Sequence, residues 1–105
     1  MGNVNRPDWQ KVGEAIVLWC GWGALPTPRW DEARLSEHFG SSTAAELLPL
    51  LKELVDDFYS SDAAFTARDV SEMGTTAAGQ FRESHPEVPD AAVEAMAWAY
   101  TYDYK

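Results

Sequence analysis

One stretch of the chain, residues 43–59, repeats its hydrophobic positions with the period of an α-helix. The members of this stripe recur at helical spacing and are Leu47, Leu50, Leu51, Leu54 and Phe58. Neighbouring apolar residues widen the stripe to about half of the helix circumference, which is more than a surface helix needs. We therefore predict a central amphipathic helix over about 44–59 that contacts other helices on two sides.

Pro49 lies inside this expected helix and works against it. Proline lacks the backbone N–H and crowds the preceding turn, which costs about 3 kcal/mol when nothing compensates. Two alternatives follow: a helix kinked at Pro49, or a short first turn followed by a second helix with Pro49 at its first position. Thr43 and Glu46 have the spacing of a capping box, so Thr43 is predicted to cap the start.

Two further helices are predicted before the central one. Apolar residues at helical spacing cover 7–20 and, more thinly, 30–39. Each segment is followed directly by a glycine, which forms the left-handed C-terminal cap of a helix without strain. The second of these helices is entered either through the Thr27–Pro28 pair or through Asp31 as its N-cap.

Two helices are also predicted after the central one. Thr66 and Asp69 have a spacing similar to a capping box, at the start of a helix that His85–Pro86 ends. A break of this helix at Gly74 is the alternative. The last helix is expected over 89–102. Its end also alternates aromatic and polar residues with the period of a strand, but the chain offers no second strand to pair with it.

These segments predict an all-α fold, a single-domain bundle of four to five short helices over residues 1–105. The 46% of hydrophobic and 12% of aromatic residues supply material for a core. A single cysteine excludes an internal disulfide and suits a reducing compartment. No apolar run approaches the roughly 20 residues that span a bilayer, and the first residues are too polar for a signal peptide. We therefore expect a cytoplasmic protein that is not bound to a membrane.

The net charge of -9 is distributed unevenly along the chain. Residues 1–52 contain six acids and five bases, a net charge of -1, whereas residues 53–105 contain 11 acids and three bases, a net charge of -8. Direct binding of nucleic acid depends on Lys and Arg contacts to phosphates, so this composition argues against it. The acidic C-terminal half is the most informative feature of the sequence for function.

The residues with catalytic or ligand chemistry do not form a pattern that predicts an enzyme or a metal site. His38 and His85 lie far apart, and neither has a neighbouring His or Cys. Cys20 stands among apolar residues, which is typical of a buried structural thiol. Asp56 and Asp57 are adjacent, so on a helix they point about 100° apart and suit a solvated face better than acid–base catalysis. We expect no catalytic residue, metal or cofactor.

The acidic half favours a protein-binding module that docks a basic partner through a negative helical face. An inhibitor or immunity-type protein of a nuclease, or of another nucleic-acid-binding protein, has this chemistry, because its carboxylates take the place of phosphates. Exposed tyrosines often mark interfaces. The predicted partner-binding residues are Glu53, Asp56, Asp57, Asp62, Asp69, Glu72, Tyr102 and Tyr104.

Three alternatives remain open at the level of the sequence. The acidic surface is a solvated face that keeps the protein soluble. The protein is a structural or assembly subunit that forms homo-oligomers through an aromatic patch, with Trp22 and Tyr102 as its candidate residues. The protein binds a small molecule, or is an enzyme, and uses a pocket between its helices.

Overall fold

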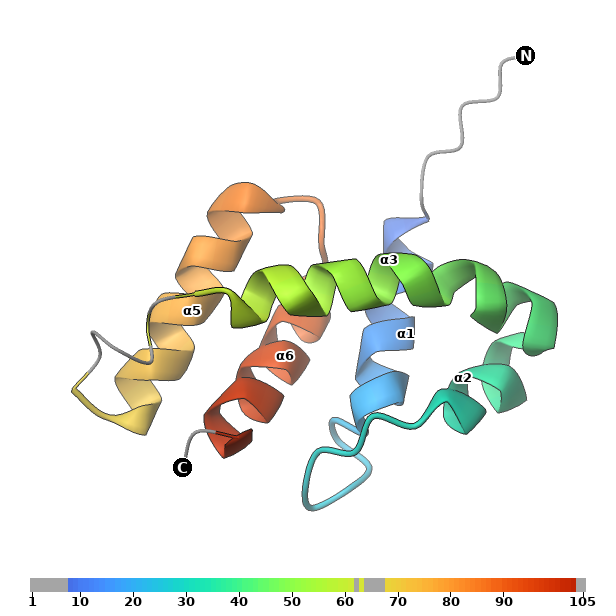
Figure 1. Cartoon of the computed structure of the whole chain (residues 1–105), viewed down its shortest axis with the longest axis horizontal. Coiled ribbons are helices and arrows are strands. Elements are labelled where there is room, and N and C mark those ends of the chain that lie inside the picture. Colours follow the sequence, from blue (N-terminus) through green and yellow to red (C-terminus); the bar gives the residue numbers. More distant parts are fainter. Residues whose placement is uncertain (1–7, 62, 64–67, 104–105) are drawn as a thin grey trace, which may run out of the picture.

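The computed structural model describes residues 8–61, 63 and 68–103 (Figure 1). Over these residues the chain forms α-helices and no strand, which confirms the predicted all-α fold. The helices are α1 (Trp9–Cys20), α2 (Glu32–Phe39), α3 (Ser41–Tyr59), α5 (Val70–Ser84) and α6 (Asp90–Asp103). None of the described helices combines the length and the apolar character that a membrane crossing requires.

Helices α5, α6 and α1 lie side by side with α6 in the middle, and α3 runs across all of them (Figure 1). α3 also contacts α2, so the predicted central helix packs against every other described helix. α1 and α6 run in the same direction. The start of α1 meets the start of α6 where Gly13 lies against Pro89, and the ends meet where the ring of Trp22 lies 5.1 Å from that of Trp98.

The ends of α1 and α2 follow the capping residues of the sequence. Asp8 caps α1 by accepting a hydrogen bond from the Lys11 backbone N–H, and Gly21 ends the helix with φ 86°. α2 begins at Glu32, two residues later than predicted, because the Asp31 carboxylate caps it by accepting from the backbone N–H of Ala33. Of the two predicted entries to this helix, Asp31 is therefore the one that is used.

The start of α3 differs from the prediction. The helix begins at Ser41, directly after Gly40, and has no side-chain cap. Gly40 has φ 88°, which glycine adopts without strain, and this single residue is both the C-cap of α2 and the N-cap of α3. The prediction that Thr43 caps the helix is wrong, because Thr43 is already inside the first turn. The helix is continuous through Pro49, which excludes the alternative of two separate helices.

Helix α5 also begins at a different cap from the predicted one. The Asp69 carboxylate accepts a hydrogen bond of 2.8 Å from the backbone N–H of Glu72, so Asp69 is the N-cap. Thr66 lies outside the described residues. The helix passes through Gly74 without a break and ends at His85 as predicted. α6 extends to Asp103, so the strand alternative for its end is wrong.

The core is apolar, and an aromatic cluster fills the place where α3, α5 and α6 meet. The ring of Phe58 lies 5.4 Å from that of Phe81 and 5.6 Å from that of Tyr100. At the other end of the molecule, the Trp19 and Trp30 rings form an edge-to-face pair. Cys20 is buried as predicted, and burial raises the pKa of its thiol, which favours the protonated, unreactive form.

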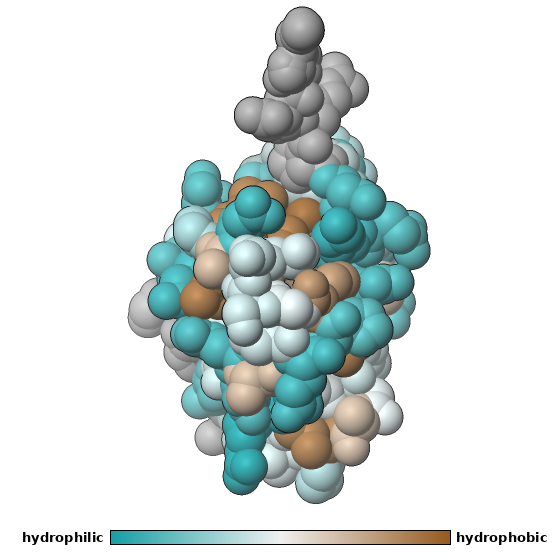
Figure 2. Space-filling view, turned by 90° about the vertical axis from the view of Figure 1, so that its right-hand side faces the viewer, coloured by the Kyte–Doolittle hydropathy of each residue, from teal (hydrophilic) through white to brown (hydrophobic). Residues whose placement is uncertain are grey.

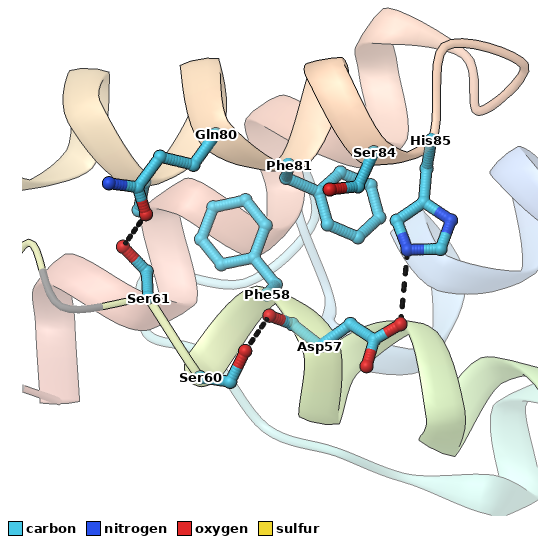
Figure 3. A pocket seen from close by; sticks show the side chains of 9 residues that line it. Asp57, Phe58, Ser60, Ser61, Gln80, Phe81, Ser84 and His85 are labelled. Atoms are coloured by element: carbon cyan, nitrogen blue, oxygen red, sulfur yellow. Dashed lines mark hydrogen bonds and ion pairs between the residues drawn. The ribbon is translucent and has the colours of Figure 1, made fainter.

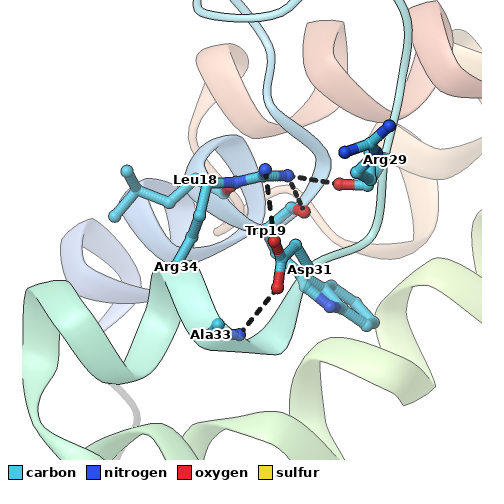
Figure 4. Close-up of polar contacts among 6 residues, drawn as sticks. All are labelled: Leu18, Trp19, Arg29, Asp31, Ala33 and Arg34. Carbon is cyan, nitrogen blue, oxygen red and sulfur yellow. Dashed lines mark hydrogen bonds and ion pairs between the residues drawn. The ribbon is translucent and has the colours of Figure 1, made fainter.

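Arg34 of α2 ties the end of α1 to the connection that follows it (Figure 4). Its guanidinium donates hydrogen bonds to the backbone carbonyls of Leu18 and Trp19, at 2.7 and 2.9 Å, and to that of Arg29. The last carbonyls of a helix have no partner within the helix. Arg34 therefore acts as the C-terminal cap of α1 from a neighbouring helix, and sequence patterns around α1 gave no sign of this.

The two helical glycines Gly79 and Gly13 should respond in opposite ways to alanine. A Cβ atom added at Gly79 meets nothing within 4 Å, so Gly79→Ala should raise the free energy of unfolding by about 1 kcal/mol through helix propensity. A Cβ atom at Gly13 would lie 2.8 Å from Cγ of Pro89, so Gly13→Ala should lower it by about 1–2 kcal/mol. Urea unfolding of both variants checks this. A shift in the same direction for both would contradict the close approach at Gly13.

Candidate functional site

A cleft of about 510 Å³ opens between the C-terminal ends of α3 and α5 (Figure 3). Phe58 and Phe81 form its apolar floor, and most of the remaining side chains are polar. The full set of lining residues is Asp57, Phe58, Ser60, Ser61, Ala77, Gln80, Phe81, Ser84 and His85. Volumes between about 300 and 1,000 Å³ are usual for ligand sites.

Helix ends and two side-chain contacts shape this cleft. α3 ends at Tyr59, and the Ser60 hydroxyl donates a hydrogen bond of 2.6 Å to the carbonyl of Asp57. Just beyond, the Ser61 hydroxyl donates to Oε1 of Gln80 on α5, also at 2.6 Å. The two helix ends are therefore held together at one side by Ser61 and Gln80, and below by the packed rings of the floor.

His85 forms the other side of the cleft (Figure 3). Its ring stacks on Phe81 at 4.6 Å and 29°, and its Nε2 atom lies 3.0 Å from Oδ2 of Asp57. Its Nδ1 atom lies 3.8 Å from Oε2 of Glu87. Each nitrogen of the ring thus faces a carboxylate, one from α3 and one from the turn after α5.

This geometry does not support serine-based catalysis, although Ser60, Ser61, His85 and Asp57 gather in one cleft. A catalytic histidine needs one ring nitrogen directed at the nucleophile and the other at the orienting carboxylate. Here both nitrogens face carboxylates, and the Ser60 and Ser61 hydroxyls donate elsewhere. The arrangement is suited to binding a polar group.

The predicted acidic residues of α3 lie on its exposed side next to the cleft. Glu53 and Asp56 are exposed, and no base of the described chain lies within ion-pair distance of either carboxylate. Asp57 is one helical turn beyond Glu53, so the two side chains share a face. We call Glu53, Asp56 and Asp57 the α3 acidic face.

The other predicted binding residues lie elsewhere or outside the described chain. Asp69 caps α5, and Glu72 pairs with Arg68 at 3.1 Å. Both are at the start of α5, about 20 Å along the helix from His85 at its end. Tyr102 is exposed on α6. Asp62 and Tyr104 lie outside the described residues, so the structure says nothing of their place.

The described part of the chain has little exposed aromatic surface. Of its large hydrophobic side chains, Tyr102 alone is exposed. Trp22 packs against Trp98 in a groove between α5 and α6 and is only partly exposed. Figure 2 shows the face at the α2 end of the molecule, where hydrophilic residues cover most of the surface and hydrophobic ones form small separate areas.

No group of three or more metal-ligating side chains gathers within the described ranges. The cleft pairing of Asp57 with His85 was missed by the sequence analysis, because the residues are 28 positions apart and belong to different helices.

Comparison with protein-family models, with curated proteins and with solved structures finds no match to this chain. Fold and site together define a small acidic all-α protein with a polar cleft between two helix ends. Its function is therefore inferred from its own residues.

Proposed function

We propose that the protein is an acidic protein-binding module, of the inhibitor or immunity type, that docks a basic partner through the α3 acidic face. A nuclease or another nucleic-acid-binding protein is the partner class that fits. The observation that supports this proposal is the pair of exposed carboxylates, Glu53 and Asp56, on a helix that every other described helix holds in place.

The distribution of the described bases leaves this face negative. Arg34, Lys52, Arg68 and Arg82 each lie within 4.0 Å of a carboxylate that is not on the α3 acidic face. Even Lys52, the neighbour of Glu53 in sequence, approaches Glu32 of α2. A face of this kind attracts a basic protein and speeds its encounter, and rigid carboxylates can occupy the positions that phosphates take on such a partner.

The test compares two double variants with the same change in net charge. Glu53→Lys with Asp56→Lys reverses the acidic face, whereas Glu37→Lys with Glu94→Lys reverses exposed acids on α2 and α6. Each tagged variant is used to capture proteins from lysate of the source cells at about 50 and about 500 mM salt, which differ strongly in screening. We expect the wild type and the α2/α6 variant to retain a basic protein at low salt and release it at high salt. The acidic-face variant should retain none.

Asp57 is left unchanged in this design because it holds His85, so its reversal would disturb the cleft as well as the charge. Circular dichroism and urea unfolding are used to check that both variants remain folded. Equal capture by both variants would mean that the acidic face is only a solvated surface and does not bind the partner.

The cleft favours one alternative, a protein that binds a small molecule between its helices. Its volume of about 510 Å³ and its polar rim over an aromatic floor are properties of a ligand site. Binding of a small cation without capture of any basic protein would support this function instead.

A further inference from the structure

We propose that a second copy of this chain docks on the groove between α5 and α6, which forms a dimer with two-fold symmetry. The groove has a volume of about 480 Å³ and contains the partly exposed pair of Trp22 and Trp98. None of the residues that line it belongs to α3, so this surface is separate from the α3 acidic face. The inference therefore goes beyond the proposed function and does not depend on it.

Helix α6 is apolar on almost every side. In its sequence, DAAVEAMAWAYTYD, the charged residues are Asp90, Glu94 and Asp103. A helix of this kind is normally buried all round, because an uncovered apolar side stays in contact with water. α1, α3 and α5 pack against α6, but Ala97 and Trp98 remain partly exposed where they line the groove. The described part of the chain therefore leaves one side of α6 without a cover.

The charges of the groove complement themselves. Arg82 on α5 and Glu94 on α6 line opposite walls, and they are the charged residues among those that line the groove. A two-fold axis that passes between them places Arg82 of each copy next to Glu94 of the other, which makes two identical ion pairs. Arg82 lies 3.4 Å from Asp90 of its own chain, and its guanidinium has further N–H donors for a second carboxylate. Glu94 is exposed, and no base of the described chain lies within ion-pair distance of it.

The groove is also the surface on which two acidic copies can meet. Each copy carries a net charge of -9, so two copies repel each other. This repulsion is smallest where the surfaces in contact carry no net charge, and Arg82 and Glu94 cancel within the groove. Salt at about 0.15 M screens charges that are more than about 8 Å away, which includes most of those on other helices. The two ion pairs between the copies offset part of the repulsion that remains.

The size of the surface indicates a weak dimer. α5 and α6 have 15 and 14 residues, so each is about 20 Å long, and two helices side by side are about 20 Å wide. A face of roughly 400 Å² in projection is at the low end for specific protein interfaces. Short side chains on the α5 wall, such as those of Ser71 and Ala78, let α6 of the second copy come close. We expect a Kd of roughly 10–100 µM.

Sedimentation equilibrium of the whole chain, between about 5 and about 500 µM, tests the proposal. We expect a monomer–dimer equilibrium for the wild type. Arg82→Glu places like charges opposite each other and should weaken association at least about tenfold. Exchange of the two charges, Arg82→Glu with Glu94→Arg, restores both ion pairs between the copies and should recover most of the association.

Arg68→Glu is the matched control. It makes the same change in net charge at an exposed arginine just before α5 and should leave association unchanged. Circular dichroism is used to check that every variant is folded. A wild type that stays monomeric at about 500 µM, equal weakening by Arg68→Glu and Arg82→Glu, or an exchange variant that stays monomeric would each overturn the inference. Assembly beyond a dimer would also overturn it, because a two-fold contact is closed.

The capture experiment responds differently to the same changes. Arg82→Glu should retain the basic partner as the wild type does, because Arg82 is not on the α3 acidic face. The α2/α6 variant contains Glu94→Lys, so it should lose the dimer and still capture the partner. Loss of capture by a folded Arg82→Glu protein would contradict the separation of the two surfaces.

Discussion

Replacing Phe58 with alanine should lower the free energy of unfolding by about 3–5 kcal/mol. Phe58 is 1% exposed, and its ring contacts those of Phe81 and Tyr100, so one side chain joins α3, α5 and α6. Its loss removes buried apolar surface and also leaves a cavity, because the facing rings belong to helices that are fixed elsewhere. The floor of the cleft would open with it.

Urea unfolding followed by tryptophan fluorescence and by circular dichroism measures this change. Tyr102→Ala is the matched control, because Tyr102 is an aromatic residue that is 43% exposed. Its replacement should lower the free energy of unfolding by much less than that of Phe58, by about 1 kcal/mol or less. A loss below about 1 kcal/mol for Phe58→Ala would show that this ring is not part of a tightly packed core.

Replacing Arg34 with glutamine should lower the free energy of unfolding by about 3 kcal/mol. A hydrogen bond to a charged group is worth about 1.5–3 kcal/mol, and the losses of several such bonds from one side chain do not add in full. The guanidinium donates to three carbonyls, those of Leu18, Trp19 and Arg29. Without it, the Leu18 carbonyl loses the donor from Arg34 at a site that is partly shielded from water, while the Trp19 carbonyl keeps only the backbone N–H of Asp31.

Two control variants separate geometry from charge at this site. Arg34→Lys keeps the charge but not the planar fork, so it should recover less than half of the lost stability. Arg29→Gln changes an exposed arginine nearby by the same substitution and should have little effect. Full stability of the Arg34→Lys protein would mean that charge alone holds the end of α1.

The fold was largely predictable because helices leave periodic apolar positions and marked ends in a sequence. Gly21 and His85 end their helices where the sequence predicts. The errors concern starts. Gly40, which has a positive φ, is both the C-cap of α2 and the N-cap of α3. The capping pattern at Thr43 therefore has no function. A Thr and an Asp both suit an N-cap, and local sequence did not distinguish Thr66 from Asp69.

The contacts between separate elements were not predictable, and these contacts make the site. The acidic character of Glu53 and Asp56 is visible in the sequence, and so is their place on the polar side of a helix. That Asp57 meets His85, or that Arg34 meets the end of α1, depends on how helices pack. Neither pairing has a characteristic spacing, so only the three-dimensional arrangement shows them.

We expect the parallel packing of α1 against α6 to make the described helices fold as one cooperative unit. Their pairing closes a loop of roughly 70 residues between Cys20 and Asp90, and this closure has an entropic cost before any contact between the two helices is gained. The buried side of α1 is covered largely by α6, which follows it by roughly 70 residues. Removing α6 would therefore expose α1, and in a nascent chain α1 should reach its native packing only after α6 has been synthesised.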